Sequence, residues 1–326
     1  MTSLRLDVYY VDVHEWRQNV SEPSIVDLRR AKLPDTDVED RKVDQYLQEE
    51  DKRMCLVSRL LPRYFVNKAT GIPFREVNVM NRERRRQGMF KPVFGPSYIK
   101  PLDPSKSVWE AYPSFSISHD NGMVAMAVHP SYGVGVDIQC LSLPRIYNSA
   151  RQFIDEMRGD VLSEGEYGFI DSHTADEDRL REFYRVWTAK ESYQKCVGLG
   201  FALPMTELEV DQSGDISRLE DGKWVSQRSG FRLKSFTLKR SDGAEFVGCV
   251  CVGELSACDP SWTCYRPKEW PSPSMGQGDV VISLRPVLDK WGLGRGSTAD
   301  GREELLNAKQ KHEKYHWEVY RCVKMK

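Results

Sequence analysis

The sequence predicts an α+β fold built from two similar halves, residues 1–130 and 131–255, followed by an extension over residues 256–326. The main observation is the order of elements, because a helical segment followed by strand-like segments occurs once in each half. The length agrees, since 326 residues exceed one small core and suit two compact units with additional sequence. The halves share no residue-level repeat, so their similarity is inferred from element order.

The composition is that of an ordinary globular protein, with 40% hydrophobic and 29% charged residues. A net charge of -1 provides no global field for nucleic acid, and no apolar run reaches the roughly 18 residues of a membrane helix. Asp7 and Asp12 interrupt the first apolar stretch and argue against a secretory signal. Eight cysteines without a CxxC pair favour reduced thiols over a zinc site, so we expect a cytoplasmic protein.

The first half begins with a strand, predicted from alternation at Leu4, Leu6 and Val8. Helical spacing predicts a helix over residues 39–66, which Pro62 is expected to end or kink. Residues 67–113 combine a basic run with several prolines and are interpreted as a loop.

A hairpin follows, because Asn121-Gly122 separates the apolar runs 115–119 and 123–128. The second half then starts with a strand over 133–138 and continues with a long helix over 178–197.

Strand patterns return in three segments, 206–211, 231–239 and 245–253. The Pro- and Gly-rich chain beyond residue 256 is interpreted as loose, with a charged terminal helix over about 301–320.

Two acid-containing patterns are candidates for chemistry. Glu191 and Lys195 are four apart on the predicted helix and therefore share one face, although a surface ion pair gives the same pattern. Asp137 and Gln139 lie on the opposite side of their strand from Val136. The Asp137 carboxylate suits a hard metal ion such as Mg²⁺. The alternative is that Asp137 only caps a turn at the end of its strand.

Ser118 and His119 end the strand before the hairpin turn. Neighbours on a strand point to opposite faces, which is poor geometry for a serine nucleophile and its base. Phosphate binding and a polar pair facing the turn are the remaining interpretations.

Several cations surround the first predicted helix and the loop after it, at Arg41, Arg53, Arg59, Arg82, Arg84, Arg85, Arg86 and Lys91. They suit a ligand with several phosphates, or form an exposed basic loop. No aromatic residue interleaves the arginine run, which speaks against nucleic acid.

Taken in order, four motifs over roughly residues 38–255 resemble the Sfp-type 4′-phosphopantetheinyl transferases, in particular their larger eukaryotic and fungal members. The motifs are Lys91-Pro92, Phe115 to His119, Gly135-Val136-Asp137, and Trp187 to Lys195. The resemblance implies a monomeric, pseudo-two-fold pair of α/β halves with coenzyme A in the cleft between them. It implies Mg²⁺-dependent transfer of the 4′-phosphopantetheine arm to a serine of an apo carrier protein, with release of adenosine 3′,5′-bisphosphate.

The resemblance also implies residue roles. Asp137 and Glu191 would hold Mg²⁺, with Gln139 or water in a third position, and Glu191 would accept the proton of the attacking serine. Lys195 and His119 would contact the reacting phosphates, with Ser118 beside them. Arg41, Arg53 and Lys91 would bind the phosphates of the nucleotide end.

Two positions depart from the family pattern. Gln139 stands where many members have glutamate, and Met89-Phe90 replaces the glycine before Lys91-Pro92. A non-catalytic module that binds coenzyme A or carriers is therefore one alternative, and a metal-dependent phosphate-ester hydrolase is another.

The expected partners are carrier domains of fatty-acid and polyketide synthases, of peptide synthetases, or of an aminoadipate reductase in lysine biosynthesis. We expect residues 140–178 to dock the carrier, with Phe153 and Ile154 as contacts.

Overall fold

The computed structural model describes residues 4–15, 43–70, 73–74, 77–84, 93–101, 114–129, 132–253 and 280–287. Helices in this part of the chain are α4 (Glu49–Thr70), α5 (Ala150–Met157), α6 (Glu164–Asp171) and α7 (Asp176–Val197), with the short 3-10 turns η3 (Gly200–Ala202) and η4 (Met205–Glu207). Its strands are β1 (Leu4–Asp12), β2 (Val77–Arg84), β3 (Val93–Pro101), β4 (Ser114–Asp120), β5 (Met123–His129), β6 (Gly133–Cys140), β7 (Leu208–Val210), β8 (Ile216–Glu220), β9 (Lys223–Ser226), β10 (Phe231–Lys239), β11 (Glu245–Gly253) and β12 (Val280–Pro286).

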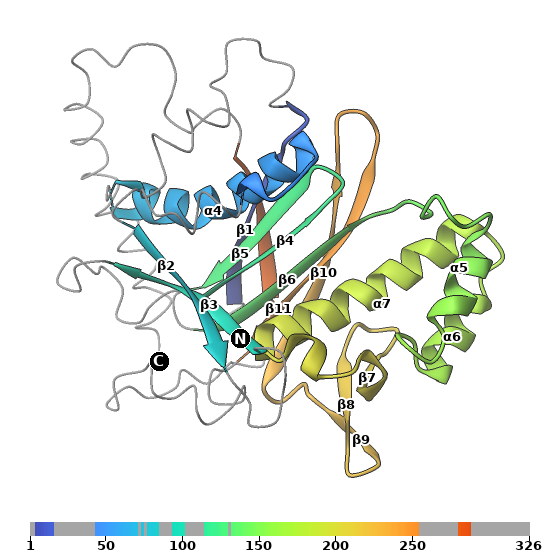
Figure 1. Cartoon of the computed structure of the whole chain (residues 1–326). Coiled ribbons are helices and arrows are strands. Elements are labelled where there is room, and N and C mark those ends of the chain that lie inside the picture. Colours follow the sequence, from blue (N-terminus) through green and yellow to red (C-terminus); the bar gives the residue numbers. More distant parts are fainter. Residues whose placement is uncertain are drawn as a thin grey trace.

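The described strands form three sheets. A six-stranded sheet has the order β12-β1-β5-β4-β3-β2, and a three-stranded sheet has the order β10-β11-β6. The small sheet β7-β8-β9 lies below α7, and its β8–β9 hairpin projects from the body (Figure 1). Neighbouring strands are antiparallel except for β1 and β12, which run parallel. The described chain contains both helices and strands, so the predicted mixture of α and β elements is confirmed.

Strand alternation builds four layers. Along β1, Leu6 and Val8 join the core between the two larger sheets, whereas Tyr9 and Val11 join the core under α4. Val136 of β6 likewise faces the core between the sheets, and the other side of β6 faces α7. The layers are thus α4, the six-stranded sheet, the three-stranded sheet and α7 (Figure 1).

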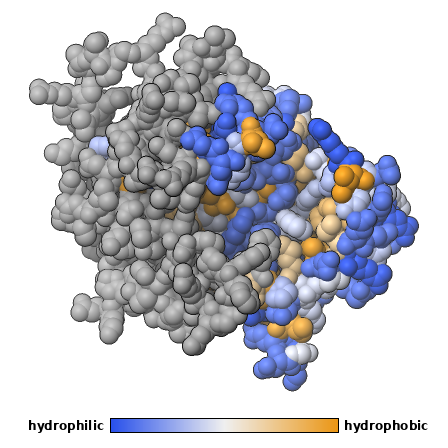
Figure 2. Space-filling view, in the orientation of Figure 1, coloured by the Kyte–Doolittle hydropathy of each residue, from blue (hydrophilic) through white to orange (hydrophobic). Residues whose placement is uncertain are grey.

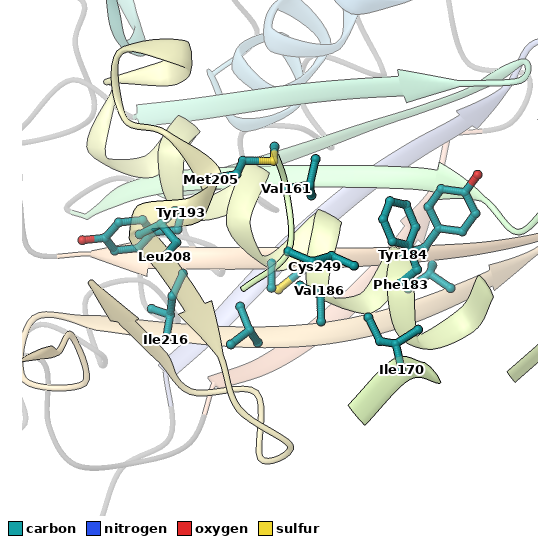
Figure 3. Packing of buried hydrophobic residues seen from close by; sticks show 14 of the residues in the cluster. Val161, Ile170, Phe183, Tyr184, Val186, Tyr193, Met205, Leu208, Ile216 and Cys249 are labelled. Carbon is teal, nitrogen blue, oxygen red and sulfur yellow. The ribbon is translucent and has the colours of Figure 1, made fainter. Parts of the chain in front are cut away.

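The core beneath α7 is aromatic and aliphatic. Figure 3 shows Phe183, Val186 and Tyr193 of α7 pointing into a cluster with Leu208 and Cys249 from β7 and β11. Burial of these side chains fixes α7 over the three-stranded sheet.

Gly135 allows an unusually close contact between β6 and α7. A Cβ atom placed on this glycine would lie 1.8 Å from the backbone oxygen of Ser192 and 2.6 Å from the backbone nitrogen of Cys196. Helix and strand backbones therefore touch at a point where any side chain would force them apart.

The hairpin and the long helix are confirmed. Asn121 and Gly122 have φ values of 42° and 79°, as expected for a two-residue hairpin turn with both central residues at positive φ. Helix α7 begins at Asp176 with an acidic first turn and ends at Gly198, whose φ of 70° is the left-handed helix stop.

The interpretation of residues 67–113 as a loop is wrong over two segments, because β2 and β3 pair there. The charged run and the prolines hid these strands, whose stability depends on pairing with each other and with β4. The extension also contains β12, which extends the large sheet beside β1. The predicted terminal helix over 301–320 lies outside the described residues.

The first helix differs from the prediction over 39–66. Residues 43–44 are helical, the chain leaves the helix at 45–48, and α4 then runs from Glu49 through Pro62 to Thr70; residues 39–42 lie outside the described residues. A proline inside a helix costs about 3 kcal/mol. Here Leu60, Leu61 and Val66 are buried on both sides of it, and their packing outweighs that cost.

Four short elements were not predicted. Helices α5 and α6 and strands β8 and β9 are each eight residues or shorter. Two signals mark them: Ser163 and Glu166 form a capping box at the start of α6, and Asp221-Gly222 forms the β8–β9 turn.

We expect Gly135→Ala to lower the free energy of unfolding by about 3 kcal/mol, because the new methyl group collides with backbone rather than with a movable side chain. Urea unfolding followed by circular dichroism measures this change. Gly168→Ala in α6 is the matched control, since no atom lies within 4 Å of its added Cβ, and its effect should stay within about 1 kcal/mol. Equal stability of Gly135→Ala and the wild type would contradict the close contact.

Candidate active site

The candidate residues come together where β4, β6 and α7 meet. Asp137 lies near the end of β6 on the side that faces α7, and Glu191 and Lys195 occupy successive turns of α7. Ser118 enters from β4, which lies along the free edge of β6. The structure thus brings together residues that are up to 77 positions apart in the sequence, from Ser118 to Lys195.

Lys195 is the centre of the cluster. Its ammonium nitrogen lies 2.6 Å from Oδ1 of Asp137 and 4.0 Å from Oε2 of Glu191, and it also donates to the backbone oxygen of Val136 at 3.2 Å. Asp137 is almost completely buried, whereas Lys195 is partly exposed. The pair is therefore more than a solvated surface ion pair, because one partner is desolvated.

Asp137 is held from three sides. Besides Lys195, its Oδ1 accepts a hydrogen bond from the hydroxyl of Ser118 at 2.7 Å, and its Oδ2 accepts one from the amide of Gln139 at 3.2 Å. These donors fix the carboxylate in one orientation and stabilise its negative charge.

Glu191 stands beside this group and is mostly buried. Burial raises the pKa of its carboxyl group, and the negative charge of Asp137 adds to the rise, whereas Lys195 opposes it. A carboxylate with a raised pKa is a better proton acceptor, provided that it is ionised.

A polar seam along β4 holds β6 in place. The hydroxyl of Ser116 accepts from the backbone N–H of Val136 at 3.0 Å, and Oδ2 of Asp120 accepts from the backbone N–H of Cys140 at 2.6 Å. With Ser118 they share one face of β4, and they satisfy two backbone N–H groups on the edge of β6 that pairs with no other described strand. The seam joins the two larger sheets and sets the register of Asp137 against Ser118.

His119 lies on the other side of β4 from Ser118, as expected, and is exposed. Partial desolvation and the charge of Lys195 lower the pKa of its imidazole, against the opposing effect of Asp120, Asp51 and Asp137. The ring is therefore mainly neutral near pH 7 and can donate one hydrogen bond.

The cations predicted for the nucleotide end are less fully described. Arg53 lies on α4 and forms an ion pair with Glu49 one turn earlier, at 3.8 Å. Arg41 and Lys91 lie outside the described residues.

Sequence reasoning missed Lys190, the residue immediately before Glu191. Its side chain is 0% exposed, and its ammonium donates to Glu166 at 2.6 Å and to the backbone oxygens of Val161 and Met205 at 2.7 and 3.1 Å. All three donors are used, although burial lowers the pKa of this lysine against the effect of Glu166. A lysine within an otherwise buried stretch of helix was the available signal.

Glu166 extends this network. It accepts backbone N–H groups from Ser163 and Val210, both at 2.8 Å. The buried pair therefore ties α6 and β7 to the side of α7 opposite the cluster, and steadies the helix that carries Glu191.

The donor atoms at the cluster suit a hard cation. Two carboxylates, of Asp137 and Glu191, already share the Lys195 ammonium, and Gln139 adds an amide oxygen. The described residues contain no group of three or more acidic, histidine or cysteine side chains placed for a metal. Mg²⁺ commonly binds through one or two carboxylates, substrate phosphates and water, so these residues fit that ion.

Comparison with known proteins gives the same interpretation as the motifs. Residues 133–251 match the model of the 4'-phosphopantetheinyl transferase superfamily, and residues 22–131 match that of the 4'-phosphopantetheinyl transferase N-terminal domain. A phosphopantetheinyl transferase of Thraustochytrium sp. is 30% identical over 230 residues, covering 68% of this chain and 74% of the relative.

Two further relatives come from a fungus and a mammal. A 4'-phosphopantetheinyl transferase of Paxillus involutus is 27% identical, over 68% of this chain and 79% of the relative. An L-aminoadipate-semialdehyde dehydrogenase-phosphopantetheinyl transferase of Rattus norvegicus is 29% identical, over 63% of this chain and 67% of the relative.

A buried acid that shares a lysine with a second acid, where β4, β6 and α7 meet, suits the electrostatic demands of phosphate-group transfer. The chain belongs to the phosphopantetheinyl transferases of the eukaryotic and fungal type, which confirms the family predicted from the motifs. It is therefore a transferase that moves the phosphopantetheine arm of coenzyme A to carrier proteins. No helix in the described part of the chain is both long and apolar enough to span a bilayer.

We expect Lys190→Met to lower the free energy of unfolding by about 3–5 kcal/mol, because Glu166 would remain buried without its counter-charge. Urea unfolding measures the loss. Arg181→Met is the matched control on the same helix: its exposed ion pairs with Glu177 and Glu245 should contribute at most about 1 kcal/mol. If both substitutions lowered the free energy of unfolding by similar amounts, the buried pair would contribute no more to stability than the exposed pairs do.

Proposed function

We propose that Asp137, Glu191 and Lys195 form the catalytic centre of the transfer, and that Mg²⁺ binds to the two carboxylates. The observation that carries this proposal is the Lys195 ammonium lying between Asp137 and Glu191, at 2.6 and 4.0 Å. Mg²⁺, when bound, would neutralise the charge of the coenzyme A pyrophosphate.

Glu191 acts as the proton acceptor in this proposal. The carrier serine oxygen attacks the phosphorus that bears pantetheine, and its proton passes to the Glu191 carboxylate, directly or through water. The bond from that phosphorus to the bridging oxygen breaks, and adenosine 3′,5′-bisphosphate leaves with the electron pair. The raised pKa of Glu191, which burial causes, favours this proton transfer.

In this proposal, Lys195 and His119 bind the phosphate groups of coenzyme A. Lys195 is partly exposed and can reach from Asp137 to a phosphate oxygen, where its charge is most useful as the transferred group develops charge. His119, exposed at the end of β4, donates one hydrogen bond to the pyrophosphate. Arg41, Arg53 and Lys91 contact the nucleotide end in this proposal.

Ser118 has a second role in the proposal. Its hydroxyl donates to Asp137 at 2.7 Å in a buried setting, so it orients the carboxylate as well as lying beside His119. Gln139 supports Asp137 in a similar way, through its amide hydrogen, and its carbonyl oxygen is available as a third ligand.

The proposed substrates are carrier domains of fatty-acid, polyketide and peptide synthases. The name of the rat relative adds the carrier of an L-aminoadipate-semialdehyde dehydrogenase, and hence lysine metabolism. A cytoplasmic monomer without nucleic-acid partners and with pseudo-two-fold halves remains part of the proposal.

Phe153 and Ile154 were predicted as docking contacts, but neither side chain is available at the surface. Both side chains belong to the core beneath α7, with 7% and 2% exposure, because α5 turns this face inward. On the face shown in Figure 2, the region of α5 and α6 is mostly hydrophilic with isolated apolar spots.

The loop between β6 and α5 carries Ile146, which is 80% exposed beside exposed Arg145, and we propose these two as carrier contacts.

We expect wild type to transfer a labelled phosphopantetheine arm from coenzyme A to apo carriers with Mg²⁺ present, and Glu191→Gln to lower kcat by about 100-fold or more. The amide keeps the shape of the side chain but cannot accept the proton. Mass spectrometry of the carrier measures the transfer. The matched control is Glu182→Gln on the same helix, where the carboxylate pairs with Arg185. Full activity of Glu191→Gln would refute its role as proton acceptor.

We expect Ile146→Asp to raise the KM for the carrier about tenfold, with the KM for coenzyme A unchanged, because an exposed apolar anchor is lost. Steady-state kinetics with both substrates varied separates the two constants. Leu47→Asp, which alters an apolar side chain that is 95% exposed on the other half, is the control. An unchanged carrier KM would remove Ile146 from the docking surface.

A further inference from the structure

A second cationic site lies outside the active centre, in a cavity of about 1070 Å³. Its walls are Arg185 of α7, the β7–β8 turn (212–215), the residues after β9 (228–229) and the edge of β10 (232–235). None of Asp137, Glu191 and Lys195 lines this cavity. It is therefore a separate feature of the molecule, next to the projecting β8–β9 hairpin (Figure 1).

The cavity has an excess of positive charge. Its described lining contains four cations, Arg185, Arg228, Arg232 and Lys234, and a single carboxylate, Asp215. The chain as a whole has a net charge of -1, so this concentration is local and does not reflect composition.

Two of the four cations are neutralised within the protein. Arg185 pairs with Glu182 at 2.7 Å, and Arg228 pairs with Asp215 at 3.1 Å. The other two are not: Arg232 donates to the backbone oxygens of Arg228 and Phe231, and exposed Lys234 has no carboxylate within ion-pair distance among the described residues. Carbonyl oxygens orient a guanidinium but do not cancel its charge.

The rest of the lining favours a small, compact anion. The hydroxyls of Ser229 and Ser235 line the cavity as well, whereas that of Ser213 already donates to Asp211 at 2.7 Å. No aromatic residue appears among the described lining residues, so a base would have no surface on which to stack. The volume slightly exceeds the range of about 300–1,000 Å³ that small-molecule sites occupy, so it admits such an anion together with water.

We propose that this cavity binds a small polyanion carrying at least two phosphate groups, held by Arg232 and Lys234. The ligand is distinct from the transferred group, since the site is separate from the catalytic cluster. The proposal does not depend on the roles assigned to Asp137, Glu191 and Lys195.

The test is isothermal titration of the full chain with inorganic pyrophosphate in metal-free buffer, which leaves the proposed active site without the Mg²⁺ that would neutralise a pyrophosphate there. We expect one pyrophosphate to bind, and the double variant Arg232→Gln with Lys234→Gln to bind at least about tenfold more weakly, since two charge-assisted contacts are lost. The matched control removes two exposed arginines elsewhere, Arg151→Gln with Arg158→Gln, and should bind pyrophosphate as wild type does. Thermal unfolding of both double variants confirms that they are folded.

Two results would overturn the proposal. One is the absence of pyrophosphate binding, or equal binding by wild type and the Arg232/Lys234 variant. The other is binding of a polyglutamate peptide that depends on these two residues while pyrophosphate does not bind, which would make the cavity a groove for an acidic protein segment.

Discussion

The contact between the backbones of β6 and α7 at Gly135 is the constraint on which the proposed active site depends. The strand can approach the helix this closely because residue 135 has no side chain. Two residues further along β6, Asp137 then lies within 2.6 Å of the Lys195 ammonium, one helical turn beyond Glu191. The site is thus assembled by the packing of two regular elements, which positions side chains more rigidly than loops do.

Polar contacts hold α7 and β6 from both sides of this contact. On one side, Ser116 and Asp120 of β4 each accept a backbone N–H of β6, and Ser118 orients Asp137. On the other, Lys190 reaches away from the active site to a buried Glu166. Such buried groups are costly unless fully paired, and here their hydrogen bonds are complete and directional. The same residues that stabilise the layers therefore also restrict the movement of Glu191 and Lys195. Arg232 and Lys234 of β10 contrast with this pattern, because no carboxylate in the described part of the chain pairs with them.

The predictions that succeeded rest on the geometry of a single element. Glu191 and Lys195 share a face because a helix repeats every 3.6 residues, and Asp137 opposes Val136 because a strand alternates. The turn at Asn121-Gly122 follows from local backbone preference. The predictions that failed required knowledge of partners: β2, β3 and β12 are stabilised by pairing with distant strands. Phe153 was predicted as a docking contact within residues 140–178, and only the packing of α5 on α7 shows it to be buried.

The sequence by itself determined the family, and it singled out the two acids and the lysine of the candidate site. It could do so because motifs and periodicity are local properties of the chain. The tertiary structure decided which of these residues meet, that Lys195 stands between two carboxylates, and that Lys190 turns away to Glu166. It also gave the reason for the glycine of the Gly135-Val136-Asp137 motif, which is a close backbone contact. These features depend on distances between segments far apart in the chain, and such distances are fixed only when the layers pack.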